Sequence, residues 1–179
     1  MMIDVKCCPE FKTDRLVLRK PQIDDSELLF FIRNEKSSAE AMGIFPDVEQ
    51  KDTMKFISKI LLGIDNKKWH YWLIVRENKI IGSISLWNLD KELCSAEFGF
   101  QIGEKYQREG YMSEAFKTVE EYAFDVLELK KIFIYTSDDN SKAKRFVEKM
   151  NYQFLETIDE KNGKDEIVKM IVYFKDKWS

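Results

Sequence analysis

Residues 96–137 carry the pattern that most restricts the fold, because two strand-like runs flank one long amphipathic helix. The runs at 96–102 and 132–137 are short and apolar, whereas 113–127 repeats apolar residues at steps of three and four. A helix of this length can return the chain across a sheet, so the two strands that it joins can lie parallel. The N-terminus of the helix then lies near the carboxyl end of the first strand.

The rest of the chain shows the spacings of hairpins and short helices. A polar turn at 76–79 separates strand-like runs at 71–75 and 80–86, and the turn pair Asn162 and Gly163 separates runs at 152–158 and 166–174. A further strand is expected at 13–20, and helices are expected at 24–34, 54–63 and 141–150. Together these elements predict an α+β fold with a mixed, mostly antiparallel sheet flanked by helices.

The composition fits one domain of a cytoplasmic protein. A length of 179 residues suits a single domain over 1–179, with 1–12 as an N-terminal extension. Lys and Arg number 29 against 32 Asp and Glu, and the net charge of −3 disfavours a nucleic-acid partner. Cys7 and Cys8 are adjacent and suit a disulfide poorly, which favours a reducing compartment. No apolar run is long enough for a membrane helix, and the single histidine, His70, argues against a multi-histidine metal site.

The segment that leads into the long helix, IGEKYQREGYMSEA at 102–115, carries the clearest sign of chemistry. Gly110 permits a tight turn, after which the first backbone amides of the helix lack partners within it. Such an N-terminus attracts anions, and Lys105 and Arg108 add positive charge, so we expect a diphosphate ligand. The alternative is that Gly110 only turns the chain and Ser113 only caps the helix.

This segment resembles the signature [QR]-x-x-G-x-[GA] of the GNAT acetyltransferase superfamily, with Gln107 and Gly110 at its fixed positions. Met112 departs from the small residue that ends the signature, and Arg108 stands where many members have glycine. The run GYMSEA at 110–115 is similar to the branch that contains the RimJ and RimL ribosomal-protein N-terminal acetyltransferases. TDRLVLRK at 13–20 and NSKAKRFVEKMNYQF at 140–154 extend the resemblance over almost the whole chain.

The resemblance implies a GNAT fold, whose sheet splays at its centre and holds acetyl-CoA between the two parallel strands. It implies that the backbone of Phe100, Gln101 and Ile102 pairs with the pantetheine arm and that Asn140 reaches the same arm. The pyrophosphate would bind Gln107, Arg108, Glu109, Gly110, Tyr111, Met112 and Ser113. Independently of the resemblance, Gly99 in an apolar strand indicates a bulge or a close approach to the strand's backbone, which an inserted cofactor arm would require. For Asn140, an ordinary helix cap stays open as the alternative.

Transfer of an acetyl group from a thioester to an amine needs an uncharged nucleophile and a proton for the departing thiolate. Glu97 is the candidate general base, acting directly or through water, and a solvated carboxylate without a role is the alternative. No acid is assigned, because Val147 stands where many family members have a tyrosine; Tyr106, Tyr152 and water stay open. The side chains expected to wall the acceptor pocket, unless they serve only in packing, are Arg33, Asn34, Phe45, Trp72 and Trp87.

These observations predict a cytoplasmic N-acetyltransferase that uses acetyl-CoA, transfers directly in a ternary complex and needs no metal. The resemblance allows a protein N-terminus, a polyamine, an amino sugar or an antibiotic as the amine acceptor, and we favour the N-terminus. A non-catalytic module that binds or senses acyl-CoA is the rival, because Met112, Ala143 and Val147 depart from the family pattern. The sequence leaves open a monomer or a homodimer, and Cys94 as an acyl carrier is a minor alternative.

Overall fold

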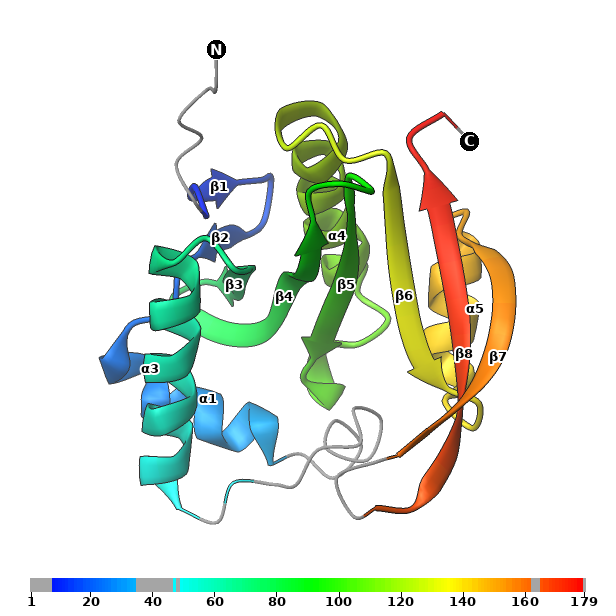
Figure 1. The fold of residues 1–179 in the computed structure, drawn as a ribbon. Coiled ribbons are helices and arrows are strands. Elements are labelled where there is room, and N and C mark those ends of the chain that lie inside the picture. The colour runs from blue at the N-terminus through cyan, green and yellow to red at the C-terminus, as the bar shows by residue number, and fades with distance from the viewer. Residues whose placement is uncertain (1–7, 35–46, 48, 162–164, 179) are drawn as a thin grey trace.

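A computed structural model describes residues 8–34, 47, 49–161 and 165–178, in which one eight-stranded sheet forms the centre of the fold (Figure 1). The strands are β1 (Phe11–Lys12), β2 (Val17–Arg19), β3 (His70–Arg76), β4 (Lys79–Asp90), β5 (Ser95–Ile102), β6 (Lys131–Ser137), β7 (Gln153–Lys161) and β8 (Ile167–Asp176). They lie in the order β1-β2-β3-β4-β5-β6-β8-β7. Neighbours are antiparallel except β5 and β6, which run parallel, so the predicted mixed sheet is confirmed.

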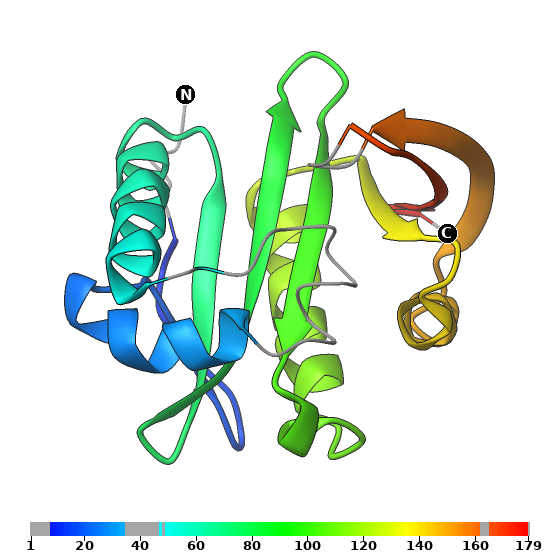
Figure 2. The same ribbon diagram turned by 90° about the horizontal axis from the view of Figure 1, so that it is seen from below.

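The helices cover both faces of this sheet (Figures 1 and 2). They are α1 (Ser26–Arg33), α3 (Gln50–Asp65), α4 (Tyr111–Glu121) and α5 (Ser141–Lys149). On one face α1 packs on β4 and α3 packs on β3, whereas α4 lies on the opposite face. The chain continues from α4 through a π-helical turn at Tyr122–Val126 before it enters β6. This connection is the crossover that the sequence predicts between the two parallel strands.

Phe116 of α4 is fully buried and joins three parts of the fold. Its ring stacks on Phe98 of β5, with centroids 4.3 Å apart, and meets Phe100 of the same strand at 5.6 Å. It also contacts Phe146 of α5 at 5.4 Å and Tyr152 at 5.6 Å. Because side chains alternate along a strand, the intervening residues of β5 point to the face of α1 and α3. The aromatic cluster therefore sets the positions of β5, α4 and α5 relative to one another.

The N-terminal part of the chain differs from its prediction. The strand expected at 13–20 is shorter, because Thr13 closes a turn: its N–H donates to the Leu16 carbonyl, and its hydroxyl accepts from the Leu16 N–H, both at 3.0 Å. The turn joins β1 to β2, so the end of the expected 1–12 extension belongs to the sheet. Leu16 and Leu18 are both buried, as their alternation indicates. The predicted turn at Asn162 and Gly163 lies outside the described residues.

Candidate functional site

The strands β5 and β6 separate partway along their length. Their pairing is confined to residues 95–97 opposite 131–133, although β5 continues to residue 102 and β6 to residue 137. The expected splay of the sheet is thus confirmed. A cavity of about 630 Å³ opens between the separated strands, which is a volume typical of small-molecule sites.

Five parts of the fold line this cavity: β5, the loop and first turn of α4, β6, α5, and β8 through Met170. The residues predicted to bind a cofactor that lie in the lining are Phe100, Gln101, Ile102, Gln107, Arg108, Gly110, Tyr111, Met112, Ser113 and Asn140. Glu109 belongs to the same loop but lies outside the lining. The sequence analysis missed the contribution of β6, which brings Ile134, Tyr135 and Thr136 to the cavity. These residues could have been predicted from the expected separation of β5 and β6, because both strands must border the space between them.

One end of the cavity is formed by the N-terminus of α4. Gly110 is the N-cap, with a φ of 81°, and Arg108 is also left-handed, with a φ of 66°. The first backbone bond of the helix runs from the Glu114 N–H to the Gly110 carbonyl, at 3.1 Å. The N–H groups of residues 111–113 thus precede the helix's own hydrogen bonds. These donors and the helix dipole favour a bound anion.

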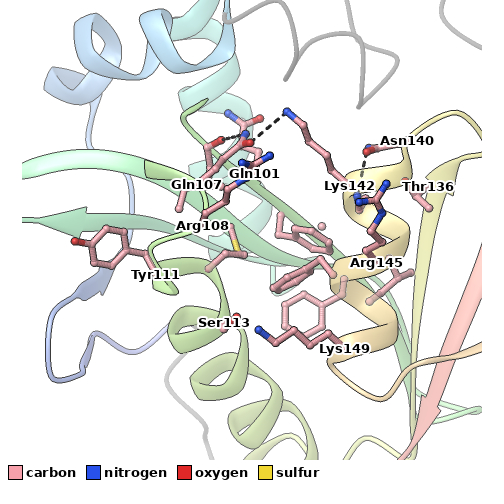
Figure 3. A pocket seen from close by; sticks show the side chains of 18 of the residues that line it. Gln101, Gln107, Arg108, Tyr111, Ser113, Thr136, Asn140, Lys142, Arg145 and Lys149 are labelled. Atoms are coloured by element: carbon pink, nitrogen blue, oxygen red, sulfur yellow. Dashed lines mark hydrogen bonds between the residues drawn. The ribbon is translucent and has the colours of Figure 1, made fainter. Parts of the chain in front are cut away.

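Basic side chains of α5 add positive charge to the same region (Figure 3). Lys142, Arg145 and Lys149 all line the cavity, and Lys142 Nζ donates to Gln107 Oε1 at 3.4 Å. Gln107 Nε2 donates in turn to the Ile102 carbonyl at 3.5 Å, which ties the loop to the end of β5. The site therefore joins a helix N-terminus to three cationic side chains, and this combination suits phosphate groups.

A family model of the acetyltransferase (GNAT) domain matches residues 15–153 of this chain. The chain belongs to the GNAT acetyltransferase family. The uncharacterized N-acetyltransferase YoaA of Bacillus subtilis is 30% identical over 149 residues, which are 81% of this chain and 83% of YoaA.

Solved structures share the GNAT fold at low sequence identity. The microcin C7 self-immunity acetyltransferase MccE, in complex with acetyl-CoA and AMP, is 21% identical with a TM-score of 0.84 over 97% of this chain and 99% of MccE. RimL, the ribosomal L7/L12 alpha-N-protein acetyltransferase, is 16% identical with a TM-score of 0.85 over 94% of each chain. These similarities confirm the predicted fold.

Glu97 lies in this GNAT domain at the last paired position of β5 and β6. Its Oε1 accepts a hydrogen bond of 2.7 Å from Asn88 Nδ2, which orients the carboxylate. Glu97 is outside the cavity lining, but Phe98 and Gly99, which follow it, are part of the lining. The carboxylate therefore lies beside one end of the cavity, and the α4 loop lies at the other end.

Gly99 is explained by packing rather than by a bulge. It pairs with Ser85 in regular register, and the irregularity between β4 and β5 falls instead between Trp87 and Asp90. A Cβ at Gly99 would lie 2.8 Å from Ser85 Oγ and 2.8 Å from Trp87 Nε1. The bulge, which was one of two alternatives for Gly99, is therefore wrong, because the glycine makes room for the Trp87 indole on the neighbouring strand. The other alternative, a close approach of a cofactor arm to the backbone, stays a prediction.

Asn140 shows the helix cap that the sequence analysis left open. It is the N-cap of α5, and its Oδ1 accepts from the Ala143 N–H at 3.1 Å (Figure 3). Asn140 also lines the cavity. Because the cap engages only the oxygen of the carboxamide, it is compatible with a contact from the amide nitrogen to a ligand.

Three tyrosines differ in their suitability as proton donors. Tyr152 is buried outside the cavity lining, and burial is the main cause that raises the pKa of its hydroxyl. Tyr106 and Tyr135 both line the cavity. Burial, followed by the negative charges of Glu97, Glu160 and Glu156, raises the pKa of the Tyr135 hydroxyl, so this group keeps its proton at neutral pH. Glu97 pairs with Phe133 of β6, and Tyr135 follows two residues later on the same side of that strand, so Tyr135 lies near the candidate base.

Residues predicted to wall the acceptor pocket are divided between two faces of the sheet. Trp72 is fully buried against Phe11 and Tyr122 on the face of α4, so its prediction as a wall is wrong. Trp87 lies on the opposite face, where its ring contacts Trp69 with centroids 5.1 Å apart. Phe45 lies outside the described residues.

At the C-terminal end of α1, Asp47 holds two further predicted wall residues. Arg33 Nε donates to Asp47 Oδ2 at 2.7 Å, and Asn34 Nδ2 donates to the Asp47 carbonyl at 2.9 Å. The Arg33 guanidinium also lies 3.8 Å from the centroid of the Phe56 ring. These contacts give Arg33 and Asn34 a packing role, which was the alternative in the sequence analysis.

Proposed function

We propose that this protein transfers an acetyl group from acetyl-CoA directly to a primary amine in a ternary complex. The cavity between β5 and β6, which ends at the N-terminus of α4, is the observation that carries this proposal. The pyrophosphate would bind the amides and side chains of residues 107–113. The pantetheine arm would run along β5 past residues 100–102, which leaves the thioester at the end of the cavity near Glu97.

The chemistry follows from this placement. The amine nitrogen attacks the thioester carbon, the carbon–sulfur bond breaks, and CoA leaves as a thiolate. In this proposal Glu97 takes the proton that the amine loses, directly or through one water molecule. The Tyr135 hydroxyl, which keeps its proton at neutral pH, gives one to the thiolate. The pKa of a thiol is near 8.5, so the thiolate is a moderately weak base and can also leave before it is protonated.

We further propose a protein or peptide N-terminus as the acceptor, in a cytoplasmic enzyme of the RimJ and RimL type. Support comes from the chain's resemblance to that branch at 110–115 and from a fold shared with RimL. At pH 7.4 deprotonating an α-amine costs below about 1 kcal/mol, whereas a lysine side chain costs about 4 kcal/mol. A single carboxylate such as Glu97 is therefore sufficient for an α-amine.

Thiol release from acetyl-CoA, measured with a panel of amines, tests these proposals. The panel contains peptides with free N-termini, the same peptides with blocked N-termini, spermidine and glucosamine. We expect release only with the free peptides. Release with spermidine or glucosamine but not with the peptides would refute the N-terminal acceptor and would still support acetyl transfer to a primary amine. A protein that binds CoA in calorimetry and releases thiol with no amine would be the acyl-CoA sensor instead.

A further inference from the structure

Arg15 connects the turn between β1 and β2 to the loop before α4, more than ninety residues further along the chain. Its Nη1 donates to the Glu109 carbonyl at 3.0 Å, and its Nε donates to Glu114 Oε2 at 2.7 Å. The Arg15 backbone N–H donates to the other oxygen of Glu114, Oε1, at 3.0 Å. The Thr13 hydroxyl donates to that oxygen as well. The N-terminal turn thus holds both the loop and the first turn of α4.

The bond to the Glu109 carbonyl fixes the direction of the next amide. In a planar trans peptide the carbonyl oxygen and the following N–H point in opposite directions. Glu109 lies outside the cavity lining and Gly110 lies within it. By holding the carbonyl on the outer side, Arg15 directs the Gly110 N–H toward the cavity. The same bond supports a loop in which Arg108 and Gly110 both have left-handed backbone angles.

The ring of Tyr111 provides a second contact with the start of α4. The Arg15 guanidinium lies 4.6 Å from the ring centroid, and that of Arg76 lies 4.9 Å from it. Figure 3 shows the Tyr111 side chain pointing away from the side chains of α5. Arg15 therefore holds the helix start from the side opposite to the basic residues of the cavity.

Arg15 also offsets an unfavourable charge. Glu114 lies in the first turn of α4, so its carboxylate would repel an anion bound at the same helix end. The ion pair with Arg15 Nε, at 2.7 Å, compensates that charge, although the Arg15 side chain is 45% exposed and the pair is partly screened by water.

We propose that Arg15 is a positioning residue, which shapes the loop at 107–113 for the pyrophosphate of acetyl-CoA without touching the reacting atoms. This inference rests on the proposed function, because it assumes that the loop binds the cosubstrate. It implies that Arg15 determines the affinity for CoA, whereas the rate at saturating acetyl-CoA depends on other residues.

The test compares Arg15→Gln, Arg15→Lys and a control, Arg19→Gln, by calorimetry with CoA and by steady-state kinetics. Arg19 lies on β2 and pairs with Asp25 at 2.7 Å, so its loss removes a similar ion pair away from the loop. We expect Arg15→Gln to weaken CoA binding about tenfold and to raise the KM for acetyl-CoA equally, with kcat unchanged. Arg15→Lys keeps the positive charge, but its single ammonium replaces a guanidinium that bonds both Glu109 and Glu114. We therefore expect CoA binding to weaken about threefold in this variant. Arg19→Gln should bind CoA as the wild type does.

A CoA affinity of Arg15→Gln within twofold of the wild type would overturn the inference, and so would a fall in kcat without a change in the KM for acetyl-CoA. If Arg15→Gln does not fold, Arg15→Lys decides, and an unchanged affinity in that variant overturns the inference. Failure of the wild type itself to bind CoA would instead refute the proposed function. The two failures are thereby distinguished.

Discussion

The left-handed backbone of Arg108 allows a test of the loop in which the backbone effect is separated from the charge. Arg108 has a φ of 66°, where a side chain with a Cβ costs about 1–2 kcal/mol. Glycine avoids that cost, but its greater conformational freedom in the unfolded chain lowers the stability of the folded state by about 0.4–1 kcal/mol. Arg108→Gly and Arg108→Ala remove the same guanidinium, so their difference reports the backbone alone. We expect the glycine variant to be more stable by about 0.5–1 kcal/mol.

Urea unfolding and thermal melting of both variants measure this difference. For a chain of this size the expected gain corresponds to a melting temperature higher by about 1–4 °C in the glycine variant. Lys117 provides the control, because it is exposed within α4 and glycine there should be less stable than alanine by about 1 kcal/mol. The two positions should therefore rank glycine and alanine in opposite orders. Equal or greater stability of Arg108→Ala would show that the loop does not hold a left-handed residue at this position.

Three further perturbations test the candidate base, the core and the loop. Glu97→Gln should lower kcat by about 100-fold or more and flatten its dependence on pH, and an unchanged pH profile would remove Glu97 from the mechanism. Phe116→Ala should lower the free energy of unfolding by about 3–5 kcal/mol in urea titrations, because the ring is fully buried among four others; a loss below about 1 kcal/mol would contradict that packing. Burial raises the pKa of Glu114, but hydrogen bonds from Thr13 and Arg15 outweigh it and leave the pKa below its usual 4.5. The resulting stabilisation is complete above that value and is lost as the pH falls through the folded-state pKa, so the stability difference between wild type and Glu114→Gln should shrink in acid.

Local patterns predicted much of the fold. The helical spacing of 113–127 and the apolar runs on either side of it led directly to the parallel pairing of β5 and β6, and the Gly110 turn located the start of α4. These features depend on neighbours within a few positions of one another. A sequence pattern therefore contains the information that is needed to find them.

Features that depend on distant partners could not be predicted in the same way. The need for glycine at residue 99 comes from Trp87 on the adjacent strand, and an isolated glycine in a strand does not say which group occupies its free space. Trp72 and Trp87 differ in their sheet face, which strand alternation indicates, but only the packed helices show which face carries the site. Arg15 contacts a loop more than ninety residues away, and nothing in TDRLVLRK identifies that partner.

The separation of β5 and β6 has a consequence for hydrogen exchange. Beyond residue 97, β5 pairs with β4 on one side only, and beyond residue 133, β6 pairs with β8 on one side only. Amides in a strand point alternately to its two sides, so every second N–H along these stretches faces the gap. Protection in the free protein should alternate from residue to residue, and CoA should slow the exposed amides of β5. In the complex that we propose, the cosubstrate would pair with β5 at the positions where no neighbouring strand does.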